Sequence, residues 1–267
     1  MNSAVAPSVT ARLAGIGTAV LGLVAMAGWA LDKAALRSVL RGAVEMKANT
    51  AASLILAGTA LYLGAHGSSS HQRATRLLAI VVAMVGVATG LEYALGLNLH
   101  IDELLFVDTG KAYNAIRGRM SPYSTVGFLG IGMALALLPS MRWRPVVWLL
   151  SALVAGIGLV SMLGYVWNAS ELVTDSVLPP VAIHTGLAFT LLGIGTLRAS
   201  RPRLAMAAGT LPNLASIELK VAAGLFGAFI LLIAAGGIAY ETSAAAAASA
   251  RAVLRSQEIR STLHQLY

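Results

Sequence analysis

The chain of 267 residues is 57% hydrophobic and only 11% charged, with a mean hydropathy of +0.77. Soluble domains carry about 25% charged residues, so this composition excludes an ordinary water-soluble enzyme and places the chain in a lipid bilayer. The net charge of +8 comes from basic residues in links between apolar runs, a pattern typical of membrane topology and not of nucleic-acid binding. The absence of cysteine excludes disulfides, thiolate metal sites and cysteine nucleophiles.

The apolar runs predict an all-α integral membrane protein with seven transmembrane helices. A membrane-spanning backbone must satisfy its own hydrogen bonds, and no strand-like alternation of ten residues occurs, so each run is expected to be helical. The predicted spans are Leu13–Leu31, Thr50–Ala65, Leu77–Leu97, Pro122–Leu138, Val146–Trp167, Val181–Leu197 and Val221–Tyr240.

Basic residues orient the predicted spans. Dense pairs with few acids, Arg73/Arg76 and Arg142/Arg144, lie in short links on one side, together with the run 198–203. Because cytoplasmic loops carry an excess of Lys and Arg, this side is expected to be cytoplasmic. The N-terminus would then be cytoplasmic and the C-terminus extracytoplasmic.

Three segments align without gaps, namely Met46–Gly58, Met120–Gly132 and Val181–Gly193. Each opens an even-numbered predicted helix with a polar or aromatic residue and then a hydroxyl, and each ends in glycine. This repeat predicts three helical hairpins, at about 12–66, 75–138 and 145–198, followed by a seventh helix at 220–240. Residues 1–240 would form one membrane module.

The three repeated helices are predicted to start at the same, outer membrane face. They are short, so their positive ends are expected to be recessed and to form a shallow cup that favours an anion or a lipid headgroup. The cup-lining residues would be Asn49, Thr50, Tyr123, Ser124, His184 and Thr185. The alternative is that these residues only cap helices and bind no ligand.

The longest link between predicted spans, 98–121, carries further candidates. Ile101–Phe106 has apolar residues at helical spacing, which predicts a short interfacial helix able to cover the cup. Arg119 is expected to pair with an acidic group, either Asp102 or a ligand anion. Glu92 lies near the outer end of a span, where an acid indicates either a structural ion pair or a ligand or proton role.

Catalytic and cofactor signatures are missing from the sequence. The five histidines have no metal-binding spacing, and only His184 lies near the interior of a span, which disfavours haem. No nucleophile elbow, phosphate loop or zinc-protease motif occurs. We therefore expect no enzymatic activity from this chain, no metal and no cofactor.

The last segment, 241–267, is polar but helical in composition. Apolar residues recur at spacings of three and four, most clearly at Ala252, Ile259, Leu263 and Leu266. This seam predicts an extracytoplasmic stalk that continues the seventh helix and pairs with a second copy, giving a homodimer. The seam stops in mid-heptad, so the natural protein is expected to continue beyond Tyr267.

Several of these motifs together resemble a family of bacterial signalling proteins. Leu91–Tyr93, His100–Phe106, Gly118–Pro122 and the helix opening that follows are similar to the multi-spanning N-terminal region of sensor histidine kinases and diguanylate cyclases. Tyr123 replaces the asparagine usual in that opening. The tail 250–267 is similar to the start of a CHASE-type periplasmic domain. The resemblance implies a sensory input module in the bacterial inner membrane, with its kinase or cyclase output elsewhere.

The leading hypothesis is therefore a membrane-embedded sensory module that passes the state of a ligand or of the membrane through its seventh helix. One rival is a transporter, which the scarcity of charge within the spans disfavours. The other rival is a structural subunit of a larger membrane complex, which nothing in the sequence excludes.

Overall fold

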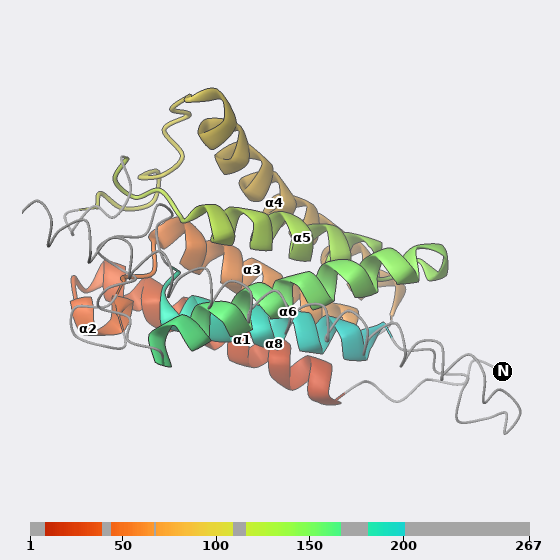
Figure 1. Cartoon of the computed structure of the whole chain (residues 1–267). Coiled ribbons are helices and arrows are strands. Elements are labelled where there is room, and N and C mark those ends of the chain that lie inside the picture. Colours follow the sequence, from red (N-terminus) through yellow and green to blue (C-terminus); the bar gives the residue numbers. More distant parts are fainter. Residues whose placement is uncertain (1–8, 39–43, 67, 109–115, 167–180, 201–267) are drawn as a thin grey trace, which may run out of the picture. The chain divides into compact units, whose positions relative to one another are not determined.

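The computed structural model describes residues 9–38, 44–66, 68–108, 116–166 and 181–200, and within these ranges the regular structure is helical (Figure 1). The seventh expected helix, Val221–Tyr240, and the expected stalk residues Ala252, Ile259, Leu263 and Leu266 lie outside these ranges.

Six helices correspond to the first six predicted spans, with ends shifted by up to eight residues. The helices are α1 (Val9–Ala30), α3 (Ala48–Gly64), α4 (Ser69–Leu95), α5 (Pro122–Leu137), α6 (Arg144–Val166) and α8 (Ile183–Ala199), with two short ones, α2 (Ala34–Arg37) and the 3-10 turn η1 (Met141–Trp143). The largest difference is at α4, which begins eight residues before the predicted span because the Ser68 hydroxyl caps it by accepting from the His71 amide at 3.3 Å.

Three helical segments are long and apolar enough to cross a membrane: Val9–Ala30, Ser70–Leu95 and Met141–Tyr165. Two shorter apolar helices are Ala48–Gly64 and Pro122–Leu137. The long helices also expose large apolar side chains, such as Leu13, Leu77 and Leu149. Such a surface fits lipid and not water, so the chain is a membrane protein.

The helices pack as three hairpins, α1–α3 (hairpin 1), α4–α5 (hairpin 2) and α6–α8 (hairpin 3). One helix of each hairpin, namely α3, α5 and α8, contacts the other two of this set, and we call these three the inner helices. Each outer helix, α1, α4 or α6, packs against its own inner partner and against the inner helix of the hairpin before it in a closed cycle. The packing therefore has an approximate three-fold repeat.

Glycines at equivalent positions allow the two helices of each hairpin to approach each other closely. A Cβ atom added at Gly58 would lie 2.6 Å from a backbone atom of α1, one at Gly132 2.5 Å from α4, and one at Gly193 2.5 Å from α6. These three glycines end the three aligned sequence segments. Lipid offers no hydrophobic drive for helix association, so close backbone contact through small residues is the main packing device.

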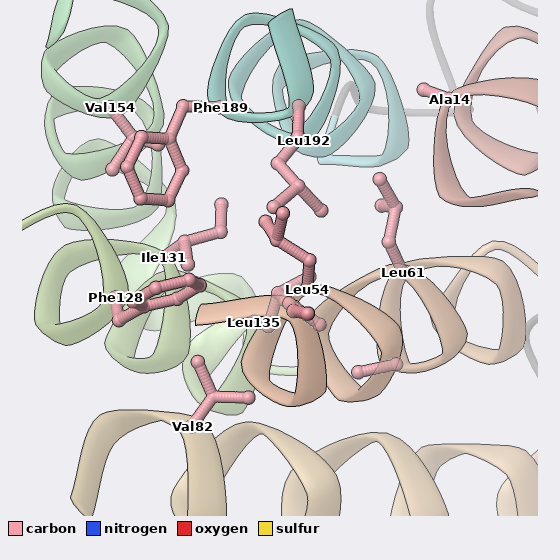
Figure 2. Close-up of a cluster of buried hydrophobic side chains, with 14 of the residues drawn as sticks. Ala14, Leu54, Leu61, Val82, Phe128, Ile131, Leu135, Val154, Phe189 and Leu192 are labelled. Atoms are coloured by element: carbon pink, nitrogen blue, oxygen red, sulfur yellow. The ribbon is translucent and has the colours of Figure 1, made fainter. Parts of the chain in front are cut away.

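The inner helices supply the two largest fully buried side chains of the core, Phe128 and Phe189. Figure 2 shows Phe128 of α5 and Phe189 of α8 within one buried cluster, and the two phenylalanine rings meet edge to face with centroids 5.0 Å apart. Leu54 of α3 occupies the repeat position equivalent to these two phenylalanines and is fully buried. One turn earlier on each inner helix lies a buried hydroxyl, from Thr50, Ser124 or Thr185.

Candidate functional site

The end of the bundle where the inner helices begin, which we call the polar end, is fastened by three equivalent hydrogen bonds. Trp29 Nε1 donates to the Met46 carbonyl at 2.9 Å, the Tyr93 hydroxyl to the Met120 carbonyl at 2.7 Å, and the Tyr165 hydroxyl to the Val181 carbonyl at 2.9 Å. Each donor lies near the end of an outer helix, and each acceptor comes just before an inner helix. The bonds therefore hold the two helices of every hairpin in one register and bring the three inner-helix starts to the same end.

Arg119 is the centre of a buried ion-pair cluster at the start of α5. Its Nε lies 2.8 Å from Asp102 Oδ2, and its Nη2 lies 3.2 Å from Glu92 Oε1 and donates to the Leu97 carbonyl at 3.2 Å. The guanidinium also lies over the Tyr93 ring, 5.4 Å from its centroid. The structure thus gives Arg119 two carboxylates of the chain itself as partners.

The Arg119 cluster contains one more carboxylate than cations. Glu92 Oε2 and Asp102 Oδ1 are both buried and have no hydrogen-bond partner. Burial raises the pKa of Asp102 above 3.8, although the hydrogen bond and the charge of Arg119 oppose the shift. Burial thus favours the neutral form of Asp102 over its charged form.

A second buried cluster joins hairpin 1 to hairpin 2. Lys47 Nζ pairs with Asp108 Oδ2 at 2.5 Å, and the Gly118 amide donates to the same oxygen at 3.0 Å. Asn49 Nδ2 donates to the Gly118 carbonyl at 3.4 Å. Sequence reasoning missed Lys47 and Asp108, since 61 positions separate them; the available signal was a lysine directly before a repeated helix and an acid in the next link.

A third set of contacts surrounds Trp29 in hairpin 1. Arg37 lies 4.6 Å from the Trp29 ring centroid and pairs with Asp32 at 3.2 Å and Glu45 at 3.3 Å. The Phe106 ring stacks on the Trp29 ring, with the two ring centroids 6.1 Å apart. None of these residues was a sequence candidate, although an aromatic ring under an arginine also occurs at Tyr93 and Arg119.

The predicted interfacial helix at Ile101–Phe106 is not formed, which corrects that expectation. The segment consists of turns and bends, and His100 has a positive φ of 58°. Side-chain acceptors fix the irregular backbone on both sides of the segment: Glu92 Oε1 accepts from the Leu99 amide at 2.7 Å, and Glu103 Oε1 accepts from the Asp108 amide at 2.8 Å.

The predicted cup residues divide into buried and exposed members. Asn49, Thr50, Ser124, His184 and Thr185 are buried, whereas the Tyr123 side chain is 43% exposed. Of the buried members, Asn49 reaches the Gly118 carbonyl beside Arg119. The hydroxyl of Ser124 lies 3.0 Å from the Ser121 hydroxyl.

Side chains satisfy first-turn amides at two of the three inner-helix starts, since Asn49 Oδ1 accepts from the Thr50 amide of α3 at 2.7 Å. Ser121 caps α5 by accepting from the Ser124 amide at 3.2 Å. The residues before α3 and α8, Lys47 and Ala182, provide no side-chain cap. His184, the second residue of α8, is only 6% exposed, and neither of its ring nitrogens has a hydrogen-bond partner.

Among the residues that the structure describes, no group of three or more His, Asp or Glu side chains is placed to hold a metal ion. Comparisons of the chain with protein-family models, with curated proteins and with solved structures give no match.

Proposed function

We propose that this chain is a membrane-embedded sensory module of a signalling protein, and that it binds an acidic ligand or a lipid headgroup at the start of α8. The observation that carries the proposal is His184, a buried imidazole whose two nitrogens have no partner. An unsatisfied buried polar group costs about 1–3 kcal/mol, and a bound ligand would recover that cost.

The surroundings of His184 favour an anion as that ligand. A neutral imidazole donates one hydrogen bond, and the first amides of an α-helix carry a partial positive charge. The N-cap residue of α8 is Ala182, whose side chain cannot accept a hydrogen bond from these amides. A phosphate or carboxylate would therefore meet both the ring N–H and free backbone donors.

Binding at this position would change the balance between hairpins. Hairpins 1 and 2 are linked at the polar end by Lys47–Asp108 and by Asn49–Gly118. A ligand on His184 would add contacts to hairpin 3, which directly precedes the expected seventh helix. A ligand acts as a signal only if it favours one packing arrangement over another, and the start of α8 is where such a preference would arise.

The topology is part of the same proposal. Basic pairs such as Arg73/Arg76 and Arg142/Arg144 would lie in the cytoplasm, with the polar end at the outer face of a bacterial inner membrane. The seventh helix would carry the change into a dimeric stalk, and the output domain would lie in another part of the protein.

The ligand site is tested by thermal unfolding of the purified full chain in nanodiscs of neutral lipid. Inorganic phosphate and short-chain phosphatidic acid are added in separate titrations, which separates a free anion from a lipid headgroup. We expect at least one of them to raise the Tm of the wild type and of the control His100→Ala, since His100 is exposed. The rise should be lost in His184→Ala.

Two outcomes would overturn the site. In the first, neither probe shifts the wild type, which would favour a structural subunit. In the second, His184→Ala responds as the wild type does. If His184→Ala does not fold, His184→Gln gives the same test, because its amide retains a donor and an acceptor at similar reach, and a partly retained response is then expected.

A further inference from the structure

Residues 97–107, the first part of the link between α4 and α5, expose apolar side chains where a loop in water would expose polar ones. Leu104 is 76% exposed and Val107 71% exposed, and Leu97, Leu99 and Leu105 are also exposed. Two of the three acids of this region point the other way: Asp102 is buried against Arg119, and Asp108, directly after the segment, is buried against Lys47. The third acid, Glu103, is exposed. The large apolar side chains thus face outward, while the two acids that form ion pairs face inward.

Several backbone groups at the two ends of this segment bind partners within the protein. The Leu99 amide donates to Glu92, the His100 amide to Asn98, and the Asp108 amide to Glu103 Oε1 at 2.8 Å. Arg119 in turn donates to the Leu97 carbonyl. The hydrocarbon region supplies no hydrogen-bond partners, so a backbone of this kind fits the membrane interface and not the hydrocarbon interior.

The exposed apolar side chains continue a surface that already faces lipid. The last turns of α4 expose Leu91 and Leu95, and α4 is one of the three helices long and apolar enough to span the membrane. Leu97 and Leu99 follow directly. A water-facing loop would expose its acids and cover its leucines, whereas a lipid-facing loop would do the reverse.

We propose that residues 97–107 lie in the lipid at the membrane interface, with Leu104, Leu105 and Val107 inserted among the acyl chains. The segment then shields the Arg119 cluster from water on the lipid side. A change in the depth of the segment in the bilayer would therefore change how well the Arg119 cluster is shielded from water, so the cluster would respond to the state of the bilayer. The proposal does not depend on a ligand at His184.

Because the chain contains no cysteine, single cysteines report on one position without background. Nitroxide labels at Leu104→Cys and Val107→Cys are compared in nanodiscs by EPR, using oxygen as the lipid-soluble and a nickel chelate as the water-soluble relaxation agent. Leu77→Cys, on the exposed face of α4, is the lipid control, and Arg117→Cys, exposed at the end of the same link, is the aqueous control.

We expect the ratio of oxygen to nickel-chelate accessibility at Leu104 and Val107 to match Leu77 and to exceed that of Arg117 severalfold. Ratios equal to that of Arg117 would overturn the proposal and place the segment in water. Low accessibility to both agents, with spin–spin broadening that disappears on dilution with unlabelled protein, would also overturn it, and would identify a second copy as the occupant.

Discussion

Replacing Gly132 by alanine tests whether close backbone contact holds the hairpins together. The new Cβ atom would lie 2.5 Å from the Ala83 amide nitrogen and 2.8 Å from the Ala79 carbonyl oxygen. Both are backbone atoms of α4 and cannot rotate away, so α4 and α5 must move apart. Overpacking of this kind costs about 1–3 kcal/mol.

Helix propensity works against that cost. Alanine is favoured over glycine within a helix by about 1 kcal/mol, so the net destabilisation expected for Gly132→Ala is about 0–2 kcal/mol. Gly17→Ala is the matched control, because a Cβ atom there would lie 3.5 Å from the Leu191 side chain, an ordinary contact. The control should be unchanged or stabilised by up to about 1 kcal/mol.

Thermal or SDS-induced unfolding in nanodiscs or detergent measures the difference between these two variants. Gly132→Ala should be less stable than Gly17→Ala by about 1–3 kcal/mol. Gly58→Ala and Gly193→Ala should behave as Gly132→Ala does, since their Cβ atoms would also lie within 2.6 Å of the outer helix. Equal stability of Gly132→Ala and Gly17→Ala would refute the reasoning.

Two further predictions concern the Arg119 cluster. Arg119→Leu leaves two buried carboxylates without their cation and should lower the unfolding free energy by about 3–5 kcal/mol. Arg117→Leu, at an exposed position, should change the unfolding free energy little. Equal effects of the two substitutions would contradict the assignment of Arg119 to a buried ion-pair cluster. The raised pKa of folded Asp102 means that its stabilisation is complete below its unfolded pKa of about 3.8 and is lost as pH rises through the folded pKa. The Tm of the wild type should therefore fall relative to that of Asp102→Asn over this pH interval, and a constant difference would argue against a raised pKa.

The all-helical membrane fold was predictable because hydropathy and the repeat act on long stretches of chain. Apolar runs marked six of the described helices to within a few residues at most ends. The exception at α4 has a physical cause: its first two turns are polar, so hydropathy does not detect them, although Ser68 marks the start chemically. Helices can continue beyond the membrane, and a hydropathy window reports only the apolar part.

The candidate site was less predictable because its contacts join distant residues. The sequence indicated Arg119 and Asp102 as a pair, and the structure brings them together with Glu92. It did not indicate Lys47 with Asp108, whose pairing depends on how two links meet after the hairpins pack. The expectation of a helix at Ile101–Phe106 was wrong, because apolar spacing does not reveal that His100 takes a positive φ and that side chains fix the backbone on both sides of the segment.

The three-fold scaffold makes its exceptions informative. The same hydrogen bond occurs in all three hairpins, donated by Trp29, Tyr93 or Tyr165. These residues therefore account for the register of the helices and not for a property of one hairpin. The residues next to them differ: Glu92 occupies the position of a glycine in hairpins 1 and 3, and His184 occupies that of Asn49 and Tyr123. A fold repeated three times needs neither a buried acid nor a buried, unpartnered imidazole at a single copy. Glu92 has a structural explanation, because it pairs with Arg119 and accepts from the Leu99 amide. The ring of His184 has no such partner among the described residues, which is why the proposed ligand site is placed there.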